Sequence, residues 1–160
     1  MNIIVEGPDG AGKSTLVAFI ANWLHWNIVA SIGPAQNARE FNDRARLSLA
    51  HQCTVFDRHP IISERIYGAM RGNVMTDPVI EQAFYIKNNI IIYYRGNPYN
   101  FAASHRIKPH DTAEHLLMLD RKHSLICDEY DKWALERAHI IYRRGESKPL
   151  LLELIKGRLT

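Results

Sequence analysis

The chain has 160 residues, 46% of them hydrophobic, and a formal net charge of +3. This length suits one globular domain with a substantial core and leaves no room for a second full domain. The mild positive charge agrees with an anionic ligand without requiring nucleic acid, and with no membrane-length apolar run or signal-like start we expect a cytoplasmic protein that does not enter a membrane.

The first predicted strand, residues 2–6, leads into a glycine-rich loop. The octapeptide GPDGAGKS at 7–14 satisfies the Walker A pattern G-x-x-x-x-G-K-[ST] and predicts binding of a nucleoside triphosphate. Its glycines let backbone amides approach phosphates, Lys13 supplies a cation, and Ser14 supplies a hydroxyl for Mg²⁺. An amphipathic helix over 15–24 follows and adds a positive dipole at its N-terminus. The residues expected to bind the ATP phosphates are Gly7, Gly10, Ala11, Gly12, Lys13, Ser14 and Thr15.

Two further β-prone runs flank a second helical pattern. The run at 26–31 precedes a helical pattern over 38–50, and the run at 52–56 ends in Asp57. A carboxylate that closes an apolar strand downstream of a Walker A loop has the form of a Walker B element, which holds Mg²⁺. Aspartates at strand ends also cap helices, so Asp57 taken alone has both interpretations.

The second half of the chain continues the alternation of strands and helices. An almost unbroken apolar run at 89–94 predicts a central strand covered on both faces. A long helical pattern spans 112–137, a short strand is expected at 139–142, and an apolar-periodic segment covers 150–159. The predicted fold is therefore a three-layer α/β/α doubly wound parallel sheet of about five strands, the P-loop NTPase fold, in one domain spanning 1–160.

The loop GPDGAGKST, taken together with the triplet Asp57-Arg58-His59, resembles thymidylate kinases, and the stretch SERIYG resembles the related deoxynucleoside kinases. The resemblance is specific over residues 2–24 and 54–72. It implies that Asp57 is the carboxylate on the magnesium side and that Arg58 binds the 5′-phosphate of the acceptor. It also implies that Asp9 lies near the phosphate and sugar of the acceptor.

One departure from that family concerns the acceptor. Thymidylate kinases carry an Arg-Glu-Pro-Gly segment after the second strand, where this chain reads SIGPAQ at 31–36, so the base remains open. Arg39 is a candidate replacement as a phosphate or ribose contact, and Tyr67 and Arg71 are candidates to stack on a base. A solvated arginine and ordinary helix packing are the alternative interpretations of these side chains.

The resemblance also implies a lid, which we expect over about 99–111. A basic lid places positive charge on the migrating phosphoryl group and excludes water. Thymidylate kinases take their catalytic arginine from the phosphate loop or from the lid, and position 11 is alanine here. We therefore expect Arg106 to be the catalytic arginine, with Arg95 second and Lys108 third, and a solvated charged loop is the alternative.

The predicted activity is Mg²⁺-dependent transfer of the γ-phosphoryl group of ATP to a deoxynucleoside monophosphate, dTMP or a similar pyrimidine nucleotide. The acceptor phosphate is already an anionic nucleophile, so no general base is needed. The catalytic residues expected are Lys13, Arg58, Arg106 and Asp9.

Two alternatives stay open. A hydroxyl acceptor, on a nucleoside or on a modified base in DNA, would need a carboxylate base such as Asp9 or Asp57, so DNA is allowed as a substrate but not favoured. A non-catalytic nucleotide-binding module is the other. A homodimer is implied by the resemblance alone.

Overall fold

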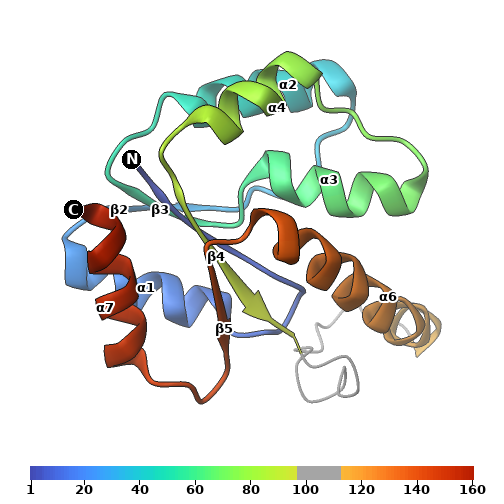
Figure 1. Cartoon of the computed structure of the whole chain (residues 1–160). Coiled ribbons are helices and arrows are strands. Elements are labelled where there is room, and N and C mark those ends of the chain that lie inside the picture. The colour runs from blue at the N-terminus through green and yellow to red at the C-terminus, as the bar shows by residue number, and fades with distance from the viewer. Residues whose placement is uncertain (97–112) are drawn as a thin grey trace.

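Five parallel strands form one sheet at the centre of the molecule (Figure 1). The computed structural model describes residues 1–96 and 113–160, and in it the strand order is β2-β3-β1-β4-β5. The chain runs from β1 to one edge of the sheet, returns through β3, and then crosses to the other side of β1, so the strand order reverses beside β1. In a doubly wound sheet, a crevice for ligands forms at the carboxyl ends of the strands at such a reversal. The strands are β1 (Ile3–Glu6), β2 (Asn27–Ala30), β3 (Thr54–Asp57), β4 (Ile90–Arg95) and β5 (Ile140–Arg143).

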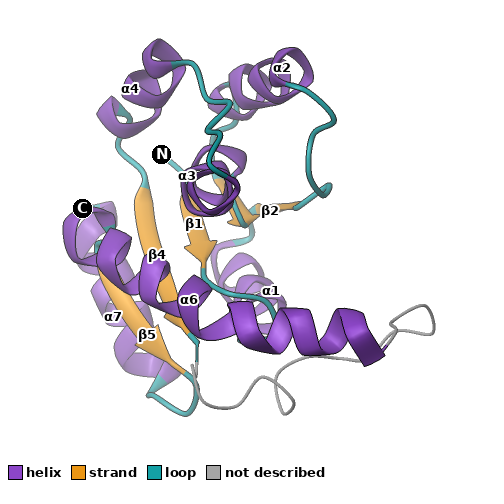
Figure 2. Cartoon of the chain, turned by 90° about the vertical axis from the view of Figure 1, so that its right-hand side faces the viewer, coloured by secondary structure: helices purple, strands orange, loops and turns teal. Residues whose placement is uncertain are grey.

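Both faces of the sheet are covered by helices, which gives three layers (Figures 1 and 2). Side chains alternate along a strand, so Ile3 and Val5 of β1 enter one core and Ile4 enters the other. All three have no exposed surface, as expected for a central parallel strand. One core takes side chains from α1 (Lys13–Leu24) and α7 (Lys148–Leu159). The other takes side chains from α2 (Ala38–Leu49), α3 (Pro60–Arg71), α4 (Pro78–Ile86) and α6 (Ala113–Arg137).

This architecture confirms the predicted fold class, a doubly wound parallel sheet of five strands between two helical layers. Two helices, α3 and α4, were not among the elements that the apolar pattern predicted. Each starts with a proline directly after a residue whose side chain accepts a hydrogen bond from the first turn, His59 for α3 and Asp77 for α4. A capping side chain followed by proline is the local signal that marks both starts.

None of the helices in the described ranges combines the length and the apolar character that crossing a bilayer requires.

Candidate active site

The loop between β1 and α1 wraps the carboxyl end of β1. Gly12 has φ of 102°, in the left-handed region that favours glycine, directly before α1 begins at Lys13. A Cβ atom on Gly7 would lie 2.2 Å from the carbonyl oxygen of Tyr94, so the loop passes against β4 at a distance that only glycine allows. The free amides of the first turn of α1 therefore open toward the space beyond the sheet, where an anion binds favourably.

Lys13 and Ser14 are the first two residues of α1, directly after the phosphate loop. Lys13 Nζ donates to the carbonyl oxygen of Pro8 at 2.6 Å, across the loop, and the side chain is buried. Burial, together with the nearby positive charge of Arg58, lowers the pKa of Lys13 to about 8, against the opposing effect of neighbouring carboxylates. Ser14 Oγ donates to Asp57 Oδ2 at 2.5 Å. The hydroxyl of the loop and the carboxylate of β3 are thus in direct contact.

This pair of oxygen groups fits Mg²⁺. Hydroxyl and carboxylate oxygens are hard donors, and Mg²⁺ is usually held by one or two protein groups plus substrate phosphates. Ser14 and Asp57 lie in contact beside the first turn of α1, and they are the residues that would hold the ion.

Arg58 follows Asp57 and points into the same crevice from a strained backbone. Its φ is 70°, a left-handed value that is uncommon for a residue with a Cβ. Its Nη2 donates to Asp9 Oδ1 at 2.8 Å, to the carbonyl oxygen of Gly7 at 3.2 Å and to the Tyr67 hydroxyl at 3.4 Å. One guanidinium therefore joins the phosphate loop to α3.

A cavity of about 500 Å³ opens on the far side of this guanidinium. Asp9 and Arg58 line one end of it, and Tyr67 and Arg71 line it from α3. Residues 29–35, which run from β2 into the following segment, form another wall, and Phe41 and Phe56 add apolar surface. The cavity thus has a charged end at the phosphate loop and a largely apolar body, which suits a ligand with one anionic end and a flat ring.

Two polar residues of this cavity were missed by sequence reasoning. Glu64 is buried, and its carboxylate accepts from Arg71 Nη2 at 2.8 and 3.0 Å and from the backbone N–H of Met75 at 3.0 Å. Arg44 lines the cavity from α2 and donates to the carbonyl oxygen of Gly33 at 3.2 Å. Arg39, the arginine of α2 proposed from sequence, is exposed and is not among the residues around the cavity. A clue was available, since Arg44 is three residues from the buried Phe41 and so shares its side of the helix.

Glu6 is a third residue whose role the sequence did not indicate. It is the last residue of β1, it has no exposed surface, and its carboxylate accepts hydrogen bonds from α3 and α6. Burial raises the pKa of the Glu6 carboxyl, while the charges of Arg58 and Lys13 and the hydrogen bonds to the carboxylate act in the opposite direction.

The predicted lid residues fall into two groups. Arg95 ends β4, and its Nε and Nη2 donate to the carboxylate of Asp131 on α6, with Nη2 to Oδ2 at 2.6 Å. The Tyr93 hydroxyl donates to the same carboxylate at 2.7 Å. Arg95 therefore fastens β4 to α6. Arg106 and Lys108 lie outside the described residues.

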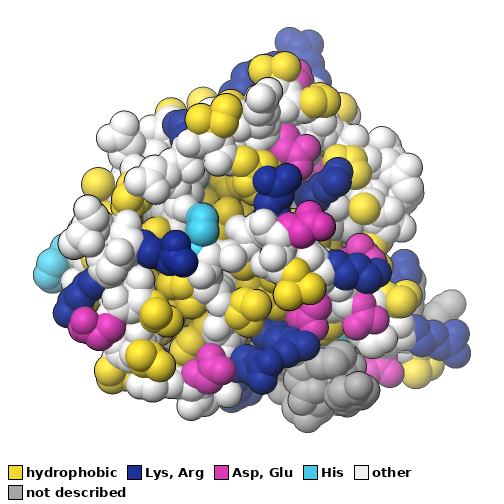
Figure 3. Space-filling model, viewed as in Figure 1, with side chains coloured by type: hydrophobic (Ala, Val, Ile, Leu, Met, Phe, Trp, Pro, Cys, Tyr) yellow, Lys and Arg dark blue, Asp and Glu magenta, His cyan; other side chains and the backbone are white. Residues whose placement is uncertain are grey.

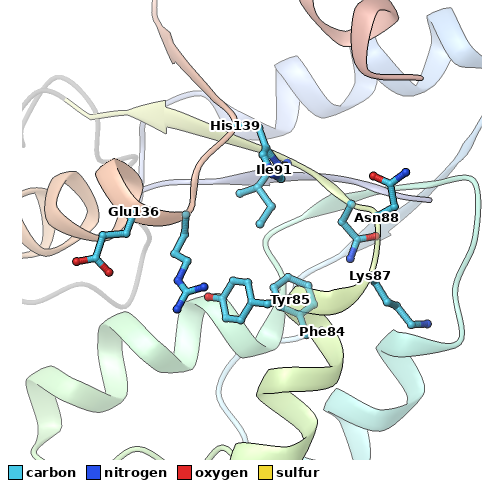
Figure 4. Close-up of a pocket in the computed structure, with 9 residues that line it drawn as sticks. Phe84, Tyr85, Lys87, Asn88, Ile91, Glu136 and His139 are labelled. Atoms are coloured by element: carbon cyan, nitrogen blue, oxygen red, sulfur yellow. Dashed lines mark hydrogen bonds between the residues drawn. The ribbon is translucent and has the colours of Figure 1, made fainter. Parts of the chain in front are cut away.

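A smaller cavity of about 200 Å³ lies near the amino ends of β4 and β5 (Figure 4). Tyr85 of α4, Ile91 near the amino end of β4, and His139, which precedes β5, surround it. Arg137 lies over the Tyr85 ring at 4.5 Å. No residue predicted for the site lines this cavity, because ligand contacts in this fold gather at the carboxyl ends of the strands.

The surface on the side of the molecule in Figure 3 carries mixed charges. Basic and acidic side chains are interspersed there rather than gathered into one continuous basic band. On this face, the charges therefore do not form the continuous basic surface that is typical of a nucleic-acid groove.

Comparison with known proteins identifies the fold. No protein-family model and no curated protein matches the sequence. Among solved structures, the chain is similar to the YorR protein from Bacillus subtilis in complex with phosphorylated GDP, with a TM-score of 0.70, 18% identity and 98% of each chain covered. It is also similar to deoxyadenosine kinase from M. mycoides with bound dATP, with a TM-score of 0.62, 18% identity and 99% of each chain covered.

A further structure of the M. mycoides kinase, with the products dCMP and dCDP, matches with a TM-score of 0.54 and 20% identity, covering 99% of this chain and 98% of the other. At these identities the likeness concerns the fold. Over 98 to 99% of its length the chain aligns with these two structures and shares their fold, which in the described residues is a five-stranded parallel sheet between two helical layers.

Proposed function

We propose that this protein is a Mg²⁺-dependent kinase that transfers the γ-phosphoryl group of ATP to the 5′-phosphate of a deoxynucleoside monophosphate, with dTMP or a similar pyrimidine nucleotide as acceptor. One observation carries the proposal. The Asp9–Arg58 pair, 2.8 Å apart, belongs both to the crevice at the phosphate loop and to the 500 Å³ cavity, so a donor site and an acceptor site share one wall. Two of the similar structures are of a deoxyadenosine kinase, and this supports phosphoryl transfer as the class of reaction.

The donor half consists of the loop and the end of β3. Loop amides and Lys13 Nζ would bind the triphosphate, for which Lys13 would exchange its bond to the Pro8 carbonyl. Ser14 and Asp57 would hold Mg²⁺, which when bound neutralises charge on the phosphates.

The acceptor half consists of Arg58 and the cavity behind it. The three side-chain hydrogen bonds of Arg58 all use Nη2, so within the described part of the chain its Nη1 and Nε donors have no hydrogen-bond partner. A planar guanidinium with free donors binds phosphate oxygens in two-pronged fashion. The apolar body of the cavity, with Tyr67 and Arg71, would then receive the sugar and base.

No general base is required for this acceptor, because its phosphate is ionised at neutral pH. Catalysis then depends on alignment of the two phosphates and on positive charge around the migrating group. As part of the proposal, a lid over about 99–111 within a single domain would supply Arg106 and Lys108 to that charge.

A hydroxyl acceptor is the second candidate, because Asp9 favours it. Its side chain lines the cavity and is 67% exposed, so it is available to take a proton from a hydroxyl, on a nucleoside or on a modified base in DNA. The likeness to deoxyadenosine kinase agrees with this candidate.

A single assay separates these candidates. The protein is incubated with ATP labelled on the γ-phosphate, Mg²⁺, and a panel of deoxynucleoside monophosphates, deoxynucleosides and hydroxymethylated DNA. Labelled diphosphates, with dTMP the best acceptor, would support the proposal. Labelled DNA or newly formed monophosphates would establish the second candidate, and tight ATP binding without any transfer would indicate a non-catalytic module.

A further inference from the structure

Glu6 places a buried carboxylate directly beneath the turn that carries Arg58. It is the last residue of β1 and has no exposed surface. Its Oε1 accepts from the backbone N–H of His59 at 2.6 Å and from Ser63 Oγ at 3.2 Å, and its Oε2 accepts from the Tyr130 hydroxyl at 2.9 Å. Three donors, from the residue that caps α3, from α3 itself and from α6, thus converge on one side chain of the strand that enters the phosphate loop.

The turn held in this way is strained. Arg58 has a left-handed backbone, which a side chain with a Cβ adopts only where its surroundings fix it. Two successive N–H groups provide that fixing, since Arg58 N donates to the Val5 carbonyl at 3.0 Å and His59 N donates to Glu6 Oε1. After the last backbone pairing between β1 and β3, the Glu6 carboxylate therefore serves as one further acceptor.

The left-handed turn at Arg58 decides where two neighbouring side chains point. Asp57, the residue before the turn, meets Ser14 on the donor side. Arg58 itself meets Gly7 and Asp9 beside the acceptor cavity. A relaxed turn would move the guanidinium away from that wall while leaving the phosphate loop intact.

We infer that Glu6 is a positioning residue that holds Arg58 toward the acceptor through the reach of its carboxylate to His59, with Tyr130 of α6 orienting that carboxylate. The inference rests on the proposed function, because it assigns Arg58 to the acceptor phosphate. Glu6 itself lies behind the turn and is not among the residues around the cavity.

The test separates reach from charge with two variants. Glu6→Asp keeps the carboxylate but withdraws it by one methylene, and Glu6→Gln keeps the reach and loses the charge. For Glu6→Asp, we expect the KM for dTMP to rise about 10-fold and kcat to fall by up to about 10²-fold, the cost of a misplaced group, with the KM for ATP unchanged. For Glu6→Gln, both constants should stay within about 5-fold of wild type.

A double-mutant cycle shows whether Glu6 acts through Arg58. If it does, Glu6→Asp should cost little further when it is added to Arg58→Lys. Glu129→Gln on α6 is the matched control, because that carboxylate contacts only Lys132 among the described residues and should leave both constants unchanged. Tyr130→Phe removes the bond to Oε2 from outside the cavity and should raise the KM for dTMP several-fold.

Wild-type kinetics in Glu6→Asp, equal losses in the Asp and Gln variants, or independent effects of Glu6→Asp and Arg58→Lys would each overturn the inference. Should Glu6→Asp fail to fold, an unchanged KM for dTMP in Tyr130→Phe would overturn it as well. Failure of the proposed function looks different, because wild-type protein would then phosphorylate no monophosphate. In that case a crystal structure of Glu6→Asp decides, since an unchanged Arg58 turn and Arg58–Asp9 pair would refute the inference and a displaced turn would support it.

Discussion

Ser14 and Asp57 are joined by a hydrogen bond of 2.5 Å, although Ser14 belongs to the Walker A motif and Asp57 to the separate Walker B-like strand end. Ser14 belongs to the first turn of α1 and Asp57 to the last position of β3, and the pairing of β1 with β3 brings them together. The contact gives the crevice two oxygen groups of the kind that bind Mg²⁺. We expect Ser14→Ala to raise the Mg²⁺ concentration needed for half-maximal activity by about 10-fold or more, measured by titrating Mg²⁺ at fixed ATP. Ser124→Ala, which removes an exposed hydroxyl of α6, provides a comparison, and equal Mg²⁺ requirements in both variants would contradict the role of Ser14.

Lys13 should be essential for turnover and dispensable for the fold. Among the described residues its ammonium group makes one hydrogen bond, to a loop carbonyl, and burial lowers its pKa to about 8. We expect Lys13→Ala to lower kcat by at least about 10²-fold while the unfolding temperature stays the same or rises. Lys156→Ala on the exposed face of α7 is the matched control. Near-normal activity of Lys13→Ala in the labelled-ATP assay would show that the assignment of Lys13 is wrong.

Gly68, in the middle of α3, leaves space for the side chain of Glu64. A Cβ atom there would lie 2.6 Å from Glu64 Oε1 and 3.0 Å from the carbonyl oxygen of Asn73. We expect Gly68→Ala to displace Glu64 and with it Arg71, so the KM for the acceptor should rise several-fold while the KM for ATP stays constant.

Gly157 of α7 supplies the comparison, because a Cβ there meets nothing within 4 Å. Gly157→Ala should therefore stabilise the protein by about 0.5–1 kcal/mol without any change in kinetics. An unchanged acceptor KM in Gly68→Ala would mean that the Glu64–Arg71 pair does not contact the acceptor.

His59 should make the stability of the protein depend on pH. Burial lowers the pKa of His59 to about 3 from its ordinary value of 6.5, with His51 contributing. Between these two values the unfolded chain binds a proton that the folded chain does not, so the free energy of unfolding falls as the pH is lowered through this window. From pH 7 to pH 5 we expect a loss of about 2 kcal/mol, which urea denaturation in the absence of metal would measure.

His59→Asn isolates this contribution, because asparagine keeps a cap on α3 and does not titrate. The free energy of unfolding of this variant should depend less on pH than that of wild type, because the titration of His59 is missing. Other groups such as Glu6 contribute equally to both proteins. Parallel pH dependences of the two proteins would mean that His59 is protonated in the folded state.

The fold was predictable because its signals are local. Each strand expected from an apolar run lies within about two residues of a strand in the structure, and the Walker pattern placed the loop between β1 and α1. The meeting of Asp57 with the loop was predictable too, since parallel strands end at one edge of the sheet.

Parts of the site were not predictable because they depend on contacts between distant segments. Glu6 looks like the polar end of an apolar strand, and its burial becomes meaningful only through partners 53, 57 and 124 positions away. The acceptor wall gives a second example. Arg39 and Arg44 belong to the same predicted helix. The spacing of Arg44 from Phe41 indicates a shared face, but the orientation of α2 on the sheet is needed to show that this face lines the cavity.

The cavity wall made by residues 29–35 and α2 has a consequence for the acceptor specificity of the proposed kinase. This wall contributes to the cavity, whereas the bonds of Lys13, Ser14 and Arg58 run to the phosphate loop, β3 and α3. Substitutions along it can therefore reshape the space offered to a base while the phosphate chemistry stays untouched. New substrate preferences in proteins of this architecture should arise first at this edge of the sheet, and an engineer who wants a different acceptor should begin there.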